Sequence, residues 1–423
     1  MNFFIKSALV IDPQSPLHGK KTSLLIENGI IKETGAGIKP GKASVIEGKN
    51  LVACPGFVDS LANFRDPGHE YKENLESGVK AALRGGFTAV CLSPNTLPPV
   101  SNKAAVNYIV KAGKKSPLYL YPLGSVTENL EGKELAEMFD MHSSGALAFT
   151  DEMKPLQNSG VLIRALLYAK SFGGLVMVFC HDPFIARDGK VHESSATLQL
   201  GLKGIPALAE EIMVAQALFL AEYCKAPIHL LSISTKRSVQ LIREAKKKKI
   251  KVTASVNAHH LYYTDADLKN FETEYKVMPP LRGKDDVKAL TEGLKDGTLD
   301  ILQTAHLPED TETKVIEFDH AAFGMASLET FLPMALESLG KTTASLTRLV
   351  QSASINPRKI LGIPPASIRK NQPAEITLFD PGVSWVHEAK QKKSLGVNDP
   401  LLGKKLIGKI TGVFCKGSYH PNT

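Results

Sequence analysis

Hydrophobic and polar positions follow two different rhythms along the chain. In the N-terminal part, short apolar stretches at 4–11, 23–26 and 30–33 predict strands. Asn28-Gly29, between the last two stretches, is a strong signal for a tight hairpin. These residues therefore predict a small sheet at the start of the chain.

From Pro55 onward, short apolar runs alternate with amphipathic stretches. One such stretch places Leu75, Val79 and Leu83 on one helical face and ends at Gly85-Gly86, a signal for a helix C-terminus. Strands that alternate with helices imply a parallel sheet, and eight such units suggest closure into a (β/α)8 barrel over residues 55–365. An open doubly wound sheet is the alternative. The eight apolar runs span residues 56–64, 88–93, 118–123, 146–150, 176–181, 228–234, 251–256 and 301–306.

Strand-like stretches return at 375–379 and 409–416, near the C-terminus. Such strands can complete the N-terminal sheet. We therefore expect a composite, sandwich-like β domain built from residues 1–54 and 366–423, attached to the barrel.

Composition and charge narrow the function classes. The 423 residues are 43% hydrophobic and 22% charged, an ordinary globular balance that can bury one large core and a smaller one. The net charge of +8 is scattered except for the lysines at 246–249. Because these follow Val239, Ile242 and Ala245 at helical spacing, they predict the solvated last turn of a helix, where cations suit the dipole. The charge pattern therefore argues against nucleic-acid binding.

The five cysteines are far apart and odd in number, which argues against a disulfide framework. The N-terminus lacks a basic leader, and no segment reaches the roughly 18 consecutive apolar residues of a membrane span. These features predict a cytoplasmic protein without a membrane segment. Neither a complete Gly-x-x-x-x-Gly-Lys-Ser/Thr loop nor a Gly-x-Ser-x-Gly elbow occurs, which argues against phosphate-loop and serine-hydrolase functions.

Residues 55–68, Pro-Gly-Phe-Val-Asp-Ser-Leu-Ala-Asn-Phe-Arg-Asp-Pro-Gly, carry the most specific signal. This segment resembles the opening of the dihydroorotases, cyclic amidohydrolases of pyrimidine biosynthesis, and the similarity covers nearly the whole chain. Further similar segments lie at 71–73, 84–88, 93–96, 149–151, 200–206, 209–211, 259–261, 279–282, 292–298 and 323–324.

The resemblance implies a metal site that this chain has largely lost. Active relatives hold zinc at the ends of the barrel strands, beginning with His-x-His on the first strand. In this chain the two histidine positions hold a leucine, which has no lone pair, and an asparagine, whose carbonyl is a poor zinc ligand. Of six ligand positions implied by the family, only the carboxylate at Asp151 is retained. The five lost positions hold Leu61, Asn63, Phe179, Ser232 and Ala305.

The catalytic base implied by the family is lost as well. Its position, an aspartate after the eighth strand, holds Ala305. General acid–base help contributes roughly 10² to 10⁴ in rate, and metal lowers the pKa of bound water to about 7, so little hydrolysis should remain. Glu309 and Met278 are further departures, standing where the family often has a histidine and an asparagine.

Arg65 and Asn95 match the residues that hold the substrate carboxylate in the family. Arginine suits bidentate carboxylate binding. Both residues also have structural explanations, because Arg65 can pair with a neighbouring acid and Asn95 lies in a turn before Thr96. Vestigial ligand binding therefore remains one hypothesis, and Asp151 is interpreted as a hydrogen-bonded remnant.

A relocated metal site would have to use the remaining histidines. His181 should share the side of Phe179, whereas His306 should point away from Ala305, because side chains alternate along a strand. His259 and His260 resemble a pair in active relatives that is not required for metal binding. Since a site needs three or four converging ligands, we expect no cofactor.

Two functions remain. The first is a non-catalytic dihydroorotase homologue kept as a structural or regulatory partner. The resemblance suggests aspartate carbamoyltransferase as its partner and a homodimer as its state. The second is an active dihydroorotase or related cyclic amidohydrolase with a rebuilt site, which would need another water activator.

Overall fold

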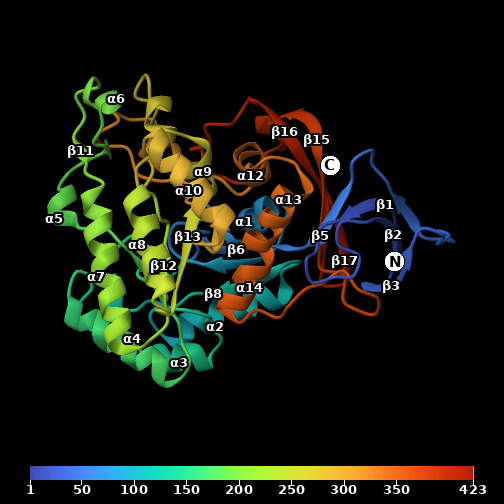
Figure 1. Ribbon diagram of the computed structural model, residues 1–423, viewed down its shortest axis with the longest axis horizontal. Coiled ribbons are helices and arrows are strands. Elements are labelled where there is room, and N and C mark those ends of the chain that lie inside the picture. Colours follow the sequence, from blue (N-terminus) through green and yellow to red (C-terminus); the bar gives the residue numbers. More distant parts are fainter. Residues whose placement is uncertain (423) are drawn as a thin grey trace.

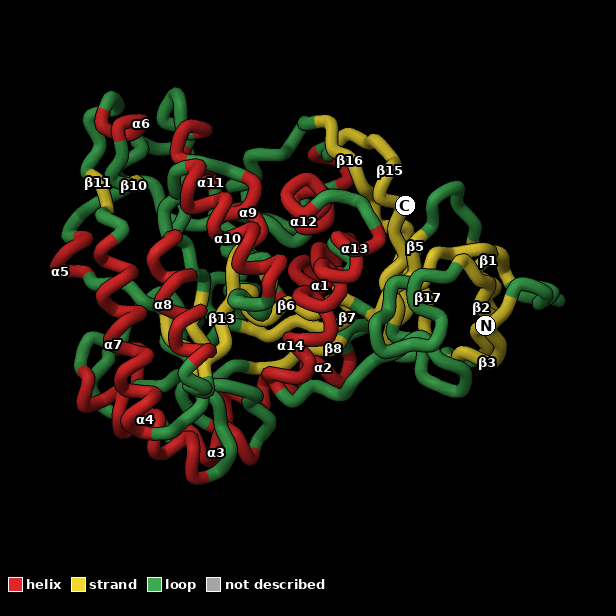
Figure 2. The backbone as a smooth tube through the Cα atoms, in the orientation of Figure 1, coloured by secondary structure: helices red, strands yellow, loops and turns green. Residues whose placement is uncertain are grey.

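The computed structural model describes residues 1–422 and has an α/β architecture (Figure 1). In the backbone view, one sheet lies at the right-hand end of the molecule, and helices α4 (Ser159–Ser171) and α7 (Leu208–Cys224) lie toward the opposite end (Figure 2). Parallel strands occupy the part between them.

The sheet at the right-hand end combines strands from both ends of the chain, because β15 pairs with β5. Its order is β17-β16-β15-β5-β1-β2-β3, with β4 on β1. The predicted hairpin joins β2 to β3, and Asn28 and Gly29 have the positive φ values, 50° and 77°, that this turn requires. The strands are β1 (Asn2–Val10), β2 (Lys21–Glu27), β3 (Ile30–Gly35), β4 (Ser44–Ile46), β5 (Val52–Pro55), β15 (Ile376–Val386), β16 (Lys405–Cys415) and β17 (Ser418–Pro421).

Seven of the eight predicted runs contain a parallel strand. The fourth run, 146–150, lies within the described chain and forms only isolated bridges, from Phe149 to Gly124 and to Val176. The seven strands are β6 (Phe57–Ala62), β7 (Phe87–Leu92), β8 (Tyr119–Pro122), β9 (Val176–Phe179), β12 (Ile228–Leu231), β13 (Val252–Asn257) and β14 (Ile301–Gln303). A short parallel pair, β10 (Val191–His192) and β11 (Gly204–Ile205), lies apart from them.

Isolated bridges link the parallel sheets. One sheet has the order β6-β7-β8 and the other β9-β12-β13-β14. Phe149 bridges the segment after β8 to β9, and Ala62 bridges His306, just beyond β14. The carboxyl ends of the first and last parallel strands therefore lie side by side.

Helices follow most of the parallel strands, as the amphipathic stretches predict. Helix α1 begins where Asn74 accepts a hydrogen bond from Ser77 N at 2.9 Å, and Gly86 follows it at φ 91°. Helix α8 ends in Lys246 and Lys247, as the lysine run predicts. The remaining α-helices are α1 (Leu75–Arg84), α2 (Lys103–Lys115), α3 (Met138–Ser143), α5 (Pro183–Ala186), α6 (Ser195–Leu198), α8 (Lys236–Lys247), α9 (Ala258–Tyr262), α10 (Lys284–Asp296), α11 (Thr311–Lys314), α12 (Phe331–Leu339), α13 (Thr343–Val350) and α14 (Asn356–Leu361). Shorter turns are η1 (Glu128–Leu130), η2 (Asp265–Asp267), η3 (Thr273–Tyr275), η4 (Gln351–Ile355) and η5 (Ala389–Gln391).

An apolar cluster joins the parallel strands. Buried Val58, Ala89, Met177 and Leu231 come from four of these strands and pack together. This cluster supports the strand ends, where the candidate site lies. Across residues 1–422, none of the helices is long and apolar enough to cross a bilayer.

Candidate functional site

Five side chains near the carboxyl ends of the parallel strands define the strand-end site: Leu61, Asn63, Glu152, Ser232 and Ala305. Backbone hydrogen bonds bring these segments together, since Asn63 N donates to His306 O at 2.8 Å. Residues at strand ends are where an α/β barrel usually carries its chemistry.

Leu61 is part of the apolar packing below the site. Its side chain is buried in the same cluster as Met177 and Leu231. Phe179 is also buried, and its ring stacks on that of His181 with centroids 5.7 Å apart. Hydrocarbon surface therefore occupies two positions at which active relatives are expected to hold histidines.

Ser232 belongs to a buried hydrogen-bond network. Its hydroxyl donates to Asn257 Oδ1 at 3.0 Å and accepts from Gln303 Nε2 at 3.1 Å. Gln303 also contacts Asn257 Oδ1 at 2.9 Å and accepts from the Ser60 hydroxyl at 2.8 Å. These neutral groups bond to one another across the strand ends and hold the Ser232 hydroxyl in place, although Asn257 Nδ2 has no partner in the described chain.

The acid that faces the strand-end site is Glu152. Asn63 Nδ2 lies 3.5 Å from Glu152 Oε2 and also donates to Asn95 O at 3.1 Å. Burial raises the pKa of Glu152, and hydrogen bonds from Ser93 and the charge of Arg65 oppose that rise. Glu152 was missed in the sequence, although it is the neighbour of Asp151.

Asp151, the ligand position that the resemblance gives as retained, is engaged by a neighbouring loop. Its carboxylate accepts hydrogen bonds from Val126 N at 2.8 Å, from Thr127 N at 3.1 Å and from the Thr127 hydroxyl. Consecutive residues face different directions, and here the first of the two acids fastens the loop that follows β8. The hydrogen-bonded role proposed for Asp151 agrees with these contacts.

Arg65 forms an ion pair with Glu309, the structural alternative considered for it. One guanidinium nitrogen contacts the Glu309 carboxylate, and Nε donates to Pro308 O at 3.1 Å. Lys72 Nζ lies 2.6 Å from the other Glu309 oxygen, and the Thr313 hydroxyl adds a contact at 3.0 Å. Glu309 is 4% exposed, so one buried carboxylate engages both cations.

Asn95 also forms hydrogen bonds with other residues of the protein. Its backbone N donates to the Ser93 hydroxyl oxygen at 3.0 Å, and its carbonyl accepts from Asn63 Nδ2 at 3.1 Å. Asn95 also contributes a side-chain hydrogen bond to Glu152. The two residues expected to hold a substrate carboxylate therefore already contact acids of this chain.

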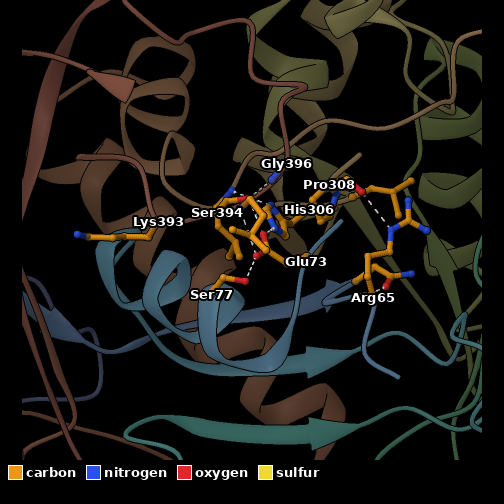
Figure 3. Close-up of polar contacts among 12 residues, drawn as sticks. Arg65, Glu73, Ser77, His306, Pro308, Lys393, Ser394 and Gly396 are labelled. Carbon is orange, nitrogen blue, oxygen red and sulfur yellow. Dashed lines mark hydrogen bonds and ion pairs between the residues drawn. The ribbon is translucent and has the colours of Figure 1, made fainter. Parts of the chain in front are cut away.

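A C-terminal segment lies against the same region (Figure 3). Glu73 accepts hydrogen bonds from the Ser394 hydroxyl at 2.5 Å and from the Ser77 hydroxyl, and it lies 3.3 Å from His306 Nε2. Burial alone would raise the pKa of Glu73, but the contacts with His306 and the two serines lower it. His306 Nδ1 accepts from Ser327 N at 3.1 Å, so its other nitrogen donates to Glu73.

The same C-terminal segment also fastens the loop after β14. Asn398 Nδ2 donates to Leu307 O at 2.8 Å, and Asn398 Oδ1 accepts from Glu309 N at 2.9 Å. Val397 N donates to Glu309 O at 2.8 Å. Sequence reasoning missed these contacts because they join residues about ninety positions apart.

The other histidines do not converge. His260 Nε2 lies 2.9 Å from Pro279 O, whereas neither ring nitrogen of the buried His259 has a partner in the described chain. Burial, helped by the charge of the nearby Arg282, lowers the pKa of His181 to about 4. His259 and His260 lie ring to ring, with centroids 4.5 Å apart, whereas His181 stacks on Phe179.

Comparisons with known proteins identify the fold and the family. The L-hydantoinase (dihydropyrimidinase) from Arthrobacter aurescens superposes with a TM-score of 0.85 at 22% identity, covering 99% of this chain and 95% of that chain. The dihydropyrimidinase from Brevibacillus agri NCHU1002 has a TM-score of 0.84, also at 22% identity, with coverages of 99% and 95%. These likenesses establish an amidohydrolase fold.

Residues 48–238 match the family model described as dihydro-orotase-like. A dihydroorotase of Syntrophus aciditrophicus (strain SB) is 40% identical over 420 residues, which cover 99% of this chain and 98% of that protein. The chain belongs to the dihydroorotase family. A dihydroorotase of Geotalea daltonii (strain DSM 22248 / JCM 15807 / FRC-32) is 39% identical over 410 residues, or 96% of each chain.

Related amidohydrolases are metal-dependent, but the strand-end site of this dihydroorotase-family chain does not fit a zinc ion. Zinc takes nitrogen, sulfur or carboxylate ligands, usually four of them. Within residues 1–422, no group of three or more histidine, cysteine, aspartate or glutamate side chains could hold a metal ion. Leu61 and Ala305 offer no donor, and Ser232 is engaged with Asn257. Only Glu152 supplies a carboxylate.

The cavity at this dihydroorotase-family site is small. It has a volume of about 30 Å³ and is lined by Leu61, Glu152, Ser232, His259 and Met278, among others. One water molecule needs about 10–15 Å³ by the same measure, so this space suits about two. A substrate ring would require the surrounding loops to move.

Proposed function

We propose that this dihydroorotase-family protein is linked to pyrimidine biosynthesis as a metal-free, non-catalytic member. In this proposal the parallel strands close into a (β/α)8 barrel, and residues 1–54 and 366–423 form the composite end domain. The protein works in the cytoplasm as a structural or regulatory partner of aspartate carbamoyltransferase.

One observation carries the proposal: side chains of the protein itself fill the strand-end site. Leu61 and Phe179 are buried hydrocarbon, and the Ser232 hydroxyl is engaged in a neutral network. Arg65, the expected carboxylate anchor, is paired with Glu309. Metal activation and general acid–base help both accelerate such hydrolysis, and at the strand-end site only Glu152 supplies a carboxylate for either role.

An active cyclic amidohydrolase is the second candidate. It is favoured by relatives named dihydroorotase that are 37–40% identical over nearly the whole chain. In this case Glu152 and the unpartnered His259 would have to assemble an unusual water-activating pair after the loops move. The two candidates differ in what they predict for metal content.

Elemental analysis of the full chain, expressed with added zinc and dialysed against a weak chelator, tests the proposal. The dihydroorotase of Syntrophus aciditrophicus, treated in parallel, is the matched control. We expect well below one equivalent of zinc in this chain. One or two equivalents surviving dialysis would instead support the active candidate.

The partner is tested separately by co-expression with aspartate carbamoyltransferase of the same organism. A specific contact should bury at least about 1,000 Å². Size-exclusion chromatography at moderate salt should then show one larger species containing both chains. Separate elution at micromolar concentrations, with a transferase that is stable and fully active alone, would remove this partner from the proposal.

A further inference from the structure

An open hollow of about 550 Å³ lies where helices α10 and α13 meet the segment after β1, which contributes Pro13. We call it the α10–α13 hollow. Gly297 in its lining comes just before β14, so the hollow lies at the amino end of that strand, away from the strand-end site. Small-molecule sites are typically clefts of about 300–1,000 Å³, often between structural units.

The lining of this hollow is polar and positively charged. Lys295 and Arg348 supply two cations, and Thr347, Gln351 and Asn356 add hydroxyl and amide groups. Among the described residues that form the lining, none is acidic or aromatic. The hollow therefore offers donors and positive charge to an anion.

The two aspartates near the hollow are each held by another cation. Asp300 Oδ2 accepts a hydrogen bond from Lys246 Nζ at 2.7 Å. Asp296 Oδ2 accepts one from Arg243 Nη2 at 2.8 Å. The two cations of the hollow itself have no carboxylate within 4.0 Å in the described part of the chain, so their charges are left for a ligand.

The Arg348 guanidinium is only partly engaged. Nη2 donates to Leu299 O at 3.1 Å, whereas the buried Nε has no hydrogen-bond partner within the described residues. Burial lowers the pKa of Arg348, and the charges of Asp300 and Asp296 oppose that fall. A guanidinium can bind an oxyanion through two parallel N–H groups, and such a ligand would offset the cost of burying its charge.

The backbone beside the hollow contains an unusual helical turn. Helices α13 and α14 are joined by the π-helical turn η4, after which Asn356 N donates to Gln351 O, five residues earlier. The two side chains line the hollow together, and Gln351 Nε2 donates to Asn356 Oδ1 at 2.7 Å. An amide nitrogen carries two hydrogens, so Gln351 keeps a second donor. Single π-helical turns are rare and frequently occur at functional sites.

The charge and chemistry of the hollow indicate which anion it fits. A phosphate monoester carries a charge of about −1.5 to −2 at pH 7, which matches two cations, whereas one carboxylate would leave a cation unpaired. The hollow also has room for more than a phosphate group. Because bases are commonly held by stacking on aromatic side chains, a polar lining without aromatic groups favours a hydroxyl-rich remainder over a base.

We propose that the α10–α13 hollow binds a phosphorylated small molecule with a hydroxyl-rich remainder, of the class of the sugar phosphates. Lys295 and Arg348 bind the phosphate group, and Gln351 donates a further hydrogen bond. This inference goes beyond the proposed function, and it does not depend on whether the strand-end site is catalytic.

Isothermal titration calorimetry of the full chain, at constant ionic strength, tests the ligand class. The probes are glucose 6-phosphate and ribose 5-phosphate, with inorganic phosphate, glucose and succinate for comparison. We expect saturable binding of at least one sugar phosphate with a Kd below about 1 mM. Inorganic phosphate should bind more weakly because it lacks the hydroxyl-rich part, and glucose should not bind because it lacks the anion. Succinate tests whether a dicarboxylate replaces the phosphate.

Three variants test the location. Lys295 is exposed, so Lys295→Gln should fold normally and weaken binding about tenfold, the loss expected for one charged hydrogen bond. Arg348→Gln should abolish binding. The matched control is Lys288→Gln, an exposed lysine two turns earlier on α10 and about 10 Å away along the helix. It should leave the affinity unchanged, and circular dichroism would verify that each variant is folded.

Binding of a sugar phosphate that Lys295→Gln weakens and Lys288→Gln does not supports the proposal, even if Arg348→Gln fails to fold. Absence of saturable binding by both sugar phosphates would overturn it. Equal affinities in Lys295→Gln and Lys288→Gln would place the ligand elsewhere. Succinate or inorganic phosphate that binds as tightly as the sugar phosphates would contradict the assigned ligand class.

Discussion

The ion pair between Arg65 and Glu309 gives a quantitative prediction. Replacing Glu309 with alanine leaves Arg65 and Lys72 without their carboxylate in a largely buried space. The Arg65 side chain is 10% exposed, that of Lys72 12% and that of Glu309 5%. Removing one partner of a buried pair typically costs about 3–5 kcal/mol. Glu309→Ala should therefore lower the free energy of unfolding by an amount in this range.

The corresponding shift in melting temperature follows from the size of the chain. With about 2.1 cal/mol/K of unfolding entropy per residue, 423 residues give about 0.9 kcal/mol/K. A loss of about 4 kcal/mol should lower Tm by about 4–5 °C. Differential scanning calorimetry at low salt and pH 7 measures this shift.

Two further variants show whether the loss of stability in Glu309→Ala comes from the unpaired charges. Glu312→Ala changes an exposed acid in the first turn of α11 and should alter stability by no more than about 0.5 kcal/mol. Adding Arg65→Met to Glu309→Ala removes one uncompensated cation and should restore part of the loss. The melting temperatures of Glu309→Ala and Glu312→Ala should differ by about 4 °C. If they differ by less than about 1 °C, the ion pair of Arg65 with Glu309 does not stabilise the loop after β14.

Two other predictions concern the site and its pH dependence. Leu61→His should not restore dihydroorotate hydrolysis, and measurable turnover in this variant would contradict the argument that several ligands are missing. Because the new imidazole would be buried against Met177 and Leu231, the variant should also lose about 1–3 kcal/mol of unfolding free energy. Burial lowers the pKa of Lys314 from 10.5 to about 7. Between pH 7 and pH 10.5 the Lys314 amine is therefore protonated in the unfolded chain but neutral in the folded one. The free energy of unfolding should rise with pH over this range, by at most about 1.4 kcal/mol per pH unit. Urea unfolding at pH 7 and pH 9 should show a smaller rise in Lys314→Met, and equal rises would refute the assignment.

Much of the fold can be predicted from the sequence because it depends on local patterns. Apolar runs locate seven parallel strands, Asn28-Gly29 locates the first hairpin, and Gly85-Gly86 locates the end of α1. The fourth run is the exception, since residues 146–150 contribute only the bridges of Phe149. The backbone of Phe149 still pairs with segments on both sides, so the apolar pattern predicts where the segment lies. The pattern does not predict that the segment forms isolated bridges in place of a continuous strand.

The candidate site was less predictable, because its contacts join distant parts of the chain. Glu309 is 244 residues from Arg65, and Ser394 is 321 residues from Glu73. No local pattern encodes such pairs. The adjacent acids Asp151 and Glu152 show a second limit, since a motif match cannot tell which of two neighbours faces the site when the strand is irregular.

Hydrolysis of dihydroorotate tests the central claim most directly. This chain, assayed with added zinc beside the dihydroorotase of Syntrophus aciditrophicus at equal concentration, should show turnover indistinguishable from a protein-free blank. The reason is that no group of side chains within residues 1–422 could hold a metal ion, and that Ala305 stands where the resemblance implies the general base. Zinc-dependent turnover within about 10⁴-fold of that enzyme, the largest factor expected from acid–base help alone, would contradict the account.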